Sequence, residues 1–208
     1  MKRLILSPAF MAIFAVAAAA LIATYLYLYQ TQQKSSNSSL AMGQVELGGP
    51  FNLIDETGKP VTEKDFAGKY MLIYFGFTYC PDVCPTDLAV MGEAMAMMED
   101  EDNDKASKIT PIFVTIDPER DVPQAIAEYT DHFHERMVGL TGDLPEIAKT
   151  AKAYRVYFNK EEPDEDGDYV MSHSAFTYLM DPNGDFVTMF KHDSKPEQMA
   201  KDVLALVK

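Results

Sequence analysis

Apolar and polar positions divide the chain into three parts. No charged side chain stands between Arg3 and Lys34, and the segment Pro8–Tyr29 is apolar except for Thr24. A helix of this length crosses a hydrocarbon core of about 30 Å. The polar, low-complexity stretch that follows buries too little apolar surface to order itself. The pattern therefore predicts a membrane anchor at 1–29, a flexible tether at 30–44 and a folded domain at 45–208.

The residues around the apolar segment predict how the chain crosses the membrane. Lys2 and Arg3 precede it, which favours a cytoplasmic N-terminus and an exported C-terminal domain. Small residues at Ala17–Ala20 resemble a cleavage site, but the apolar segment continues through Leu26, so we expect an uncleaved anchor. Because the anchor begins almost at Met1, it leaves no room for a transit peptide. We expect a single pass through a bacterial cytoplasmic (inner) membrane, with the C-terminal domain in the periplasm.

Beyond the tether, apolar runs of strand length alternate with stretches of helical periodicity. The runs at 70–77 and 109–116 are nearly continuous, as in strands buried on both faces of a sheet. Further strands are predicted at 51–54, 61, 137–140, 175–180 and 186–190, and helices at 86–102, 123–135, 144–153 and 196–207. Helices that fall between strands indicate an α/β fold with a mixed, mainly parallel sheet. In such sheets, functional sites gather at the carboxyl ends of strands.

Charge and cysteine content exclude two classes of protein. The chain has 18 Lys and Arg against 32 Asp and Glu, a net charge of −14. Without the first 34 residues, 15 basic and 32 acidic side chains remain, a net charge of −17. Contacts to phosphates need clustered Lys and Arg, so a nucleic-acid-binding protein is excluded. Two cysteines are too few for a small domain held together by disulfides.

Both cysteines lie in one short segment, Cys80–Pro85, at the carboxyl end of the most apolar strand. Each precedes a proline, which disfavours the α conformation, so the two thiols meet only if the loop folds back. Pro85 suits a first helical turn, which makes Cys84 a cap position with a thiol pKa lowered by the positive helix end. Three interpretations remain open from these residues: a structural disulfide, a redox-active pair and metal binding.

A histidine stands where it could complete a metal site. His173 immediately precedes the strand predicted at 175–180. If that strand lies beside the one at 70–77, the loop before it approaches the cysteines. Two thiolates and an imidazole favour Cu(I), Cu(II) or zinc over hard cations such as calcium. A lone histidine before a strand also fits a surface or hydrogen-bonded residue, so the alternatives stay open.

Other polar and soft side chains have a structural interpretation. Asp117, Arg120 and Asp121 follow a strand end close to the expected position of the cysteine loop. Asp121 is placed to cap the helix predicted from 123, while a role for these residues beside the metal loop or in docking is the alternative. The acidic run at 161–168 is typical of a solvated loop, with steering of a basic partner as the alternative. Three methionines share one helical stripe, which favours core packing over thioether ligation: Met91, Met95 and Met98.

The segment Tyr74–Pro85 closely resembles the signature of the Sco/SenC family. Stretches at 115–121, 139–142 and 154–157 match in the same order, and an acidic loop and a histidine follow. The resemblance runs from about Leu47 to the C-terminus. It implies a thioredoxin-like fold, a mixed central sheet flanked by helices, together with a single N-terminal transmembrane helix.

The same resemblance implies a function and a ligand set. Members of the family help to assemble the binuclear copper centre of cytochrome c oxidase. Carried over, Cys80, Cys84 and His173 bind one copper ion per chain, as Cu(I), Cu(II) or both. The implied partners are the copper-bearing subunit of the oxidase, an upstream copper donor and a thiol reductant.

A thiol–disulfide oxidoreductase is the alternative function. Its Cys80–Cys84 pair would reduce the cysteines of the copper centre. Thioredoxin-like reductases have a two-residue spacer and a cis-proline before the later strand, whereas this chain has a three-residue spacer and Ala175 at that position. Both differences count against a general reductase. We therefore expect a metallochaperone rather than an enzyme, with thiol–disulfide reductase activity at most secondary.

Overall fold

Two strands that are buried along their whole length form the centre of the domain. They are β3 (Tyr70–Gly76) and β4 (Ile109–Thr115), which run parallel and pair residue for residue from Tyr70 with Ile109 to Gly76 with Thr115. Strands covered on both faces have no polar side to display, and this is why their sequences are continuous apolar runs. The prediction of two buried strands is confirmed.

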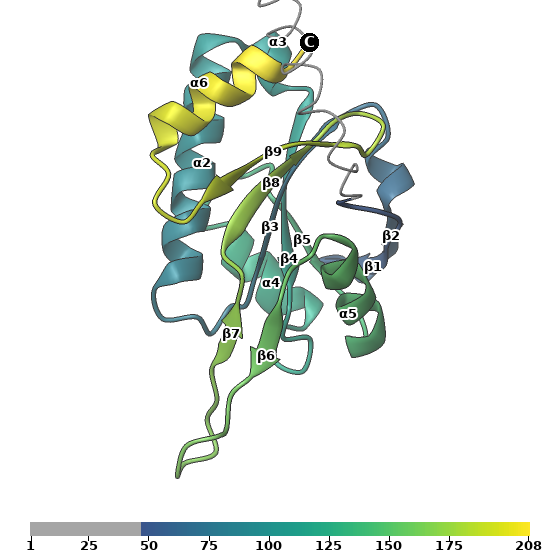
Figure 1. Cartoon of the computed structure of the whole chain (residues 1–208), viewed down its shortest axis with the longest axis vertical. Helices are drawn as coiled ribbons and strands as arrows, with labels where there is room; N and C mark the ends of the chain where they lie inside the picture. The colour runs from purple at the N-terminus through teal and green to yellow at the C-terminus, as the bar shows by residue number, and fades with distance from the viewer. Residues whose placement is uncertain (1–46) are drawn as a thin grey trace, which may run out of the picture. The chain divides into compact units, whose positions relative to one another are not determined.

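The other strands extend this pair into a mixed sheet of seven (Figure 1). The order across the sheet is β2-β1-β5-β4-β3-β8-β9. Among the strand pairs of the described residues, only β3–β4 and β4–β5 are parallel, whereas β1–β2, β1–β5, β3–β8 and β8–β9 are antiparallel. The sheet is therefore mixed as predicted, but the prediction that it is mainly parallel was wrong. The remaining strands are β1 (Asn52–Asp55), β2 (Pro60–Thr62), β5 (Val138–Thr141), β8 (Phe176–Met180) and β9 (Phe186–Lys191).

Helices connect the strands and cover the sheet. They are α2 (Val83–Glu101), α3 (Asn103–Ala106), α4 (Pro123–Thr130), α5 (Leu144–Ala153) and α6 (Pro196–Leu206), with a 3₁₀ turn at Glu63–Phe66. α2 packs against α6, and α5 packs against β1 (Figure 1). Successive side chains of β3 point to opposite faces, so the ring of Phe75 meets that of Tyr154 after α5, with centroids 5.3 Å apart. The arrangement is a thioredoxin-like fold, as predicted.

The predicted methionine stripe belongs to the core. Met91, Met95 and Met98 of α2 are completely buried. They recur at helical spacing because that side of α2 faces the sheet and α6. The interpretation as core packing is confirmed.

Several predicted boundaries were wrong. α2 begins at Val83 rather than Thr86, because the first turn of a helix needs no N–H partners and so tolerates Pro85. α4 ends at Thr130 rather than 135. Beyond it, the guanidinium of Arg136 donates to the backbone oxygen of Ile109, which draws the chain back toward the sheet.

A second, two-stranded sheet was not predicted at all. It is the hairpin of β6 (Phe158–Lys160) and β7 (Met171–His173), joined by the acidic loop. Strands of three residues that carry polar and charged side chains show no alternation long enough to be recognised. Because His173 is the last residue of β7, this hairpin determines where the histidine lies.

The computed structural model describes residues 47–208, and these residues form one compact unit. The anchor predicted at 1–29 and the tether predicted at 30–44 lie outside them. Among the helices of the described part, none combines the length and the apolar character needed to cross a membrane.

Candidate metal centre

The two cysteines lie where β3 ends and α2 begins. Cys80 is in the connecting loop and half-buried, and Cys84 is the second residue of the helix and fully buried. The helix is capped by Asp82, so the prediction that Cys84 occupies the cap was wrong. The backbone N–H of Cys84 donates to Sγ of Cys80 across 3.3 Å. The loop thus folds back as predicted and brings two free thiols together.

Gly76 makes room for the buried thiol. A Cβ atom at this position would lie 2.9 Å from Sγ of Cys84 and equally close to the ring of Tyr74. Carbon and sulfur do not pack at that distance, so a larger residue would displace the cysteine. The glycine at the end of β3 is therefore part of how the strand accepts the loop.

His173 reaches the cysteines from the hairpin. Its Nε2 lies 3.3 Å from Sγ of Cys84, and its Nδ1 lies 3.1 Å from the backbone oxygen of Ser174. The rings of Tyr74 and Phe77 meet the imidazole edge-on, with centroids 6.2 and 6.0 Å away. A hydrogen bond from Nδ1 to a carbonyl holds the ring so that Nε2 is directed at the site, the arrangement typical of a ligating histidine.

The structure therefore brings the three predicted ligands together. Their ligand atoms, Sγ of Cys80, Sγ of Cys84 and a ring nitrogen of His173, all lie within 4.8 Å of one another. Within residues 47–208 this is the one cluster of its kind. Two sulfurs and one imidazole suit Cu(I) or zinc and disfavour calcium and magnesium.

The hydrogen bond between the two thiols shifts their pKa values in opposite directions. The hydrogen bond from the Cys84 thiol, aided by His173, lowers the pKa of Cys80 to about 4. The same bond and burial raise the pKa of Cys84. The prediction of a lowered pKa at Cys84 was wrong, because burial and the neighbouring thiolate outweigh the helix end. In the metal-free protein Cys80 is the thiolate, and metal binding releases the remaining proton.

Asp121 stabilises the loop that precedes Cys80 through hydrogen bonds to its carboxylate. Its buried carboxylate accepts hydrogen bonds from the backbone N–H of Thr78 at 3.0 Å, the hydroxyl of Thr78 at 2.5 Å and the hydroxyl of Thr115 at 2.6 Å. α4 is capped by Val122, so the interpretation of Asp121 as a helix cap was wrong. The carboxylate instead ties the residue two positions before Cys80 to the end of β4. Burial raises the pKa of Asp121.

A buried acid beside the site was missed in the sequence. Asp87 lies one turn after Cys84, and its Oδ1 is 2.8 Å from Nδ1 of His192, a histidine for which no partner was foreseen. Burial raises the pKa of Asp87, and the carboxylate in turn raises the pKa of His192. One signal was available: Asp87 stands four residues before Met91, on the stripe already assigned to the core.

The acidic run Glu161–Asp168 forms the exposed tip of the hairpin. This agrees with the interpretation as a solvated loop. Asp117 lies closer to the site: it is buried and forms an ion pair with Arg120, at 2.6 Å between Oδ2 and Nε.

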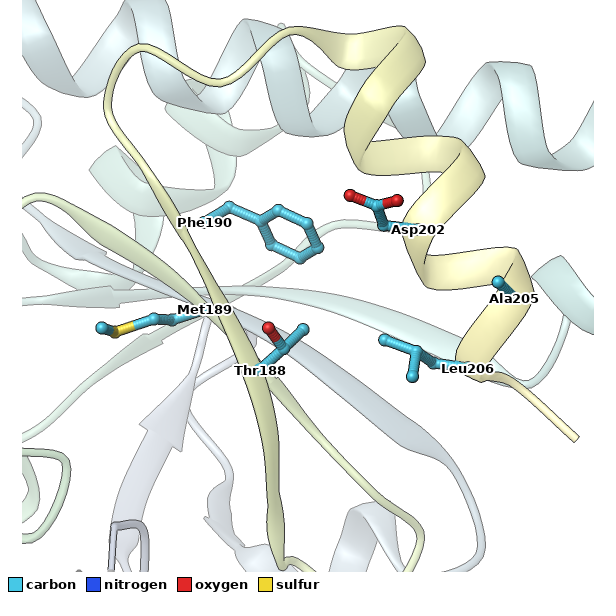
Figure 2. Close-up of a pocket in the computed structure, with 6 residues that line it drawn as sticks. All are labelled: Thr188, Met189, Phe190, Asp202, Ala205 and Leu206. Carbon is cyan, nitrogen blue, oxygen red and sulfur yellow. The ribbon is translucent and has the colours of Figure 1, made fainter. Parts of the chain in front are cut away.

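A cavity of about 340 Å³ lies apart from the cysteines (Figure 2). It is lined by β9 and α6: Thr188, Met189, Phe190, Asp202, Ala205 and Leu206. Its one carboxylate, Asp202, already accepts a hydrogen bond from Gln198. None of the three candidate ligands contributes to it.

The fold and the cluster together define a thioredoxin-like domain with a Cys-Cys-His metal site. The SCO1/SenC family model matches residues 41–208, and the chain belongs to this family. It is 42% identical over 196 residues to Protein sco1 of Schizosaccharomyces pombe, covering 90% of this chain and 73% of that protein. The mitochondrial SCO1 homologue of Mus musculus is 43% identical, over 79% of this chain, and the chain spans only 57% of that protein's length.

Solved structures agree in fold. The structure of Bradyrhizobium japonicum ScoI with copper bound is 46% identical, has a TM-score of 0.69 and covers 76% of this chain and 98% of its own. The structure of Arabidopsis thaliana ScoI with copper bound is 40% identical, with a TM-score of 0.72, and covers 76% of this chain and 96% of its own. A putative electron transfer protein of Aquifex aeolicus, 17% identical with a TM-score of 0.57, shares the fold alone.

Proposed function

We propose that this protein is a copper metallochaperone that binds copper through Cys80, Cys84 and His173 and helps to assemble the binuclear copper centre of cytochrome c oxidase. The observation that carries the proposal is the convergence of the three ligand atoms within 4.8 Å. Membership of the SCO1/SenC family, and relatives whose structures hold copper, support it.

The geometry of the site suits a metal that is handed on. Cys80 is partly exposed and lies in a loop, and His173 ends a hairpin outside the main sheet, so two of the three ligands belong to peripheral segments. Three ligands also leave a copper ion open to a fourth from a partner. Cys84 on α2 forms the buried side of the site. In this proposal copper is the cargo, which the protein binds temporarily before transfer to a partner.

A copper titration tests the proposal. We expect the full chain, reduced and solubilised in detergent, to bind about one copper ion per chain, with the Cu(II) form showing a thiolate charge-transfer band. His173→Ala should bind much more weakly, because two thiolates alone do not fill the site. His132→Ala is the matched control, since His132 is exposed and is not one of the three clustered residues. No stoichiometric copper in the parent would refute the proposal, and unchanged affinity in His173→Ala would remove that ligand.

The proposed partners follow from the chemistry of the thiols. Both sulfurs must be reduced to bind copper, so a thiol reductant is required in an oxidising compartment. A copper donor must act before this protein, and the copper-bearing oxidase subunit after it. Mixing copper-loaded protein with the metal-free copper domain of that subunit should transfer the metal, and retention of all copper would contradict the assignment.

We also propose the predicted location: an uncleaved helix within 1–29 anchors the chain in a bacterial inner membrane, and the domain faces the periplasm. The charge-free apolar segment and the preceding Lys2 and Arg3 support it. The full chain should stay in membranes washed with carbonate and be cleaved by protease added to spheroplasts. A variant lacking 1–29 is the control and should be absent from the membrane fraction. Protection of the full chain from protease would overturn the orientation.

Thiol–disulfide exchange is a second candidate, favoured by the low pKa of Cys80. A thiol with a pKa of about 4 is a thiolate at neutral pH and the partner Cys84 stands beside it, the arrangement of a reducing pair. The test is turnover with a mixed disulfide or an oxidised copper-site peptide. Absence of turnover would reject this function and leave copper binding untouched.

A further inference from the structure

The hairpin that carries His173 does not belong to the seven-stranded sheet. Within the described residues, β6 and β7 hydrogen-bond as strands only to each other. In Figure 1 they extend away from the body of the domain. Only Ser174 and Ala175 join His173 to β8, so the backbone brings the histidine to the edge of the sheet, and side-chain contacts help to orient the hairpin relative to the cysteine loop.

Arg120 makes two of these contacts, both to Tyr169 in the segment that leads into β7. It lies in the loop between β4 and α4, and its Nη1 donates to the backbone oxygen of Tyr169 across 2.9 Å. Its guanidinium carbon also lies 3.7 Å from the centroid of the Tyr169 ring, a cation–π contact. Tyr169 stands four residues before His173 on the same arm of the hairpin. The arginine thus contacts the segment that leads into β7 and His173.

Asp117 makes this contact rigid. Its carboxylate accepts from Nε of Arg120 at 2.6 Å with one oxygen, and from the hydroxyl of Tyr169 at 2.8 Å with the other. Asp117 is buried, and its backbone N–H donates to the hydroxyl of Thr115 at 2.9 Å. The carboxylate is therefore anchored at the end of β4 and orients both side chains. A guanidinium held in this way presents its donors in a planar fork.

The same guanidinium also contacts the cysteine loop. The ring of Tyr79, the residue next to Cys80, has its centroid 4.6 Å from the guanidinium carbon of Arg120. Arg120 thus contacts both the neighbour of Cys80 and the segment that leads into the strand of His173. Lys160 also lies over the Tyr169 ring at 3.9 Å, but its ion pair with Glu119 is solvent-exposed and contributes little.

We propose that Arg120 is a positioning residue of the metal site, which couples the hairpin of His173 to the loop of Cys80. The inference rests on the proposed copper binding and adds a residue that touches neither metal nor ligand. Replacing residues that orient metal ligands typically costs about 10–100-fold in affinity. We expect about a tenfold loss for Arg120→Ala, because His173 remains present and is only less well held.

The copper titration of the full chain in detergent is repeated with variants of Arg120. Arg120→Ala should lose about tenfold in copper affinity, with a weaker thiolate band, while still binding one equivalent of copper. Arg120→Lys retains the charge but not the fork, and should recover little of the loss. Lys149→Ala is the matched control, because it removes an exposed basic residue from α5. An affinity equal to the parent's in Arg120→Ala would overturn the proposal, as would full recovery in Arg120→Lys.

A double-mutant cycle separates positioning from general destabilisation. If Arg120 acts through the histidine, Arg120→Ala should change the copper affinity of His173→Ala by less than about threefold, since the group being positioned is already gone. An equal loss in both backgrounds would show that Arg120 acts through the fold or the cysteines, and would refute the coupling to His173.

Hydrogen exchange on the metal-free protein tests the positioning without copper. Arg120→Ala should speed amide exchange in β6 and β7 while β3 and β4 stay protected, because the contacts it removes lie at the hairpin. Unchanged exchange in the hairpin would refute the inference. Hydrogen exchange also separates the failure of this inference from the failure of the proposed function. If the parent binds no copper, the proposed function is refuted, but exchange in β6 and β7 still shows whether Arg120 stabilises the hairpin.

Discussion

Asp121 offers the most stringent test of how the cysteine loop is held. Its fully buried carboxylate accepts three hydrogen bonds, one from Thr115 that is buried and two from Thr78 that are partly buried. Replacing it by alanine leaves those three donors without an acceptor, next to the cavity of the lost side chain. The backbone oxygen of Asp121, which accepts from Thr141, is unaffected. Asp121→Ala is therefore a nearly pure removal of the carboxylate.

The expected size follows from these bonds. A hydrogen bond to a charged group contributes about 1.5–3 kcal/mol, so three set an upper limit of about 9 kcal/mol. Burial of the carboxylate, which raises its pKa, offsets part of this. We expect a loss of about 3–5 kcal/mol in the free energy of unfolding, the range typical of a broken buried network. For a domain of this size the melting temperature should fall by about 6–20 °C.

Urea denaturation and thermal melting measure the loss, with Asp143→Ala as control. Asp143 caps α5 through one hydrogen bond to the backbone of Glu146 at 2.9 Å, and losing such a cap costs about 1 kcal/mol. The comparison is between Asp121, a buried carboxylate that accepts three hydrogen bonds, and Asp143, an exposed carboxylate that accepts one. If Asp121→Ala costs no more than Asp143→Ala, the carboxylate does not hold the loop and the reasoning fails.

Three further substitutions probe the core and the surroundings of the thiols. Gly76→Ala should destabilise the domain by about 1–3 kcal/mol and weaken copper binding, because its methyl group displaces Cys84; urea denaturation and copper competition measure both. Met95→Ala should cost about 2–5 kcal/mol in urea denaturation and leave copper stoichiometry unchanged, because the side chain is core. His192→Asn should destabilise the protein at about pH 6 and hardly at about pH 9: Asp87 raises the pKa of His192, so its stabilisation is complete below the unfolded pKa and disappears as pH rises through the folded one.

Each of these has a clear contrary result. If Gly76→Ala has the stability and copper affinity of the parent, the end of β3 accommodates the methyl group without displacing Cys84. If Met95→Ala binds less copper per chain than the parent, the alternative that the Met95 thioether is a copper ligand would be supported again. Equal destabilisation of His192→Asn at both pH values would show that the ion pair with Asp87 is not what the histidine contributes.

The buried strands and the methionine stripe were predictable because their patterns are local. A strand covered on both faces must be apolar throughout, as at 70–76 and 109–115, and a helix with one buried face repeats every three to four residues, as at Met91, Met95 and Met98. These patterns involve residues that are close together in the sequence, so they can be recognised without the structure.

The hairpin and the acids beside the site follow no local rule. Three-residue strands at 158–160 and 171–173 are too short to show alternation, and they are ordered by contacts from other elements, such as Arg120 on Tyr169. Asp121 stands where a helix cap would stand, and only the approach of Thr78 from the loop after β3 makes it an anchor. The pKa of the Cys84 thiol was predicted in the wrong direction for the same reason, since burial of Cys84 depends on α2 packing onto the sheet.

By itself the sequence determined the α/β class, the two buried strands, the position of the cysteines at a strand end and, through its ordered resemblance, the family and the three residues predicted as ligands. Only the tertiary structure decided that a histidine 89 positions beyond Cys84 lies 3.3 Å from its sulfur, and which thiol holds the proton. The physical reason is that residue types and short-range periodicity are written in the chain, whereas a distance between remote side chains results from packing, burial and a few long-range hydrogen bonds.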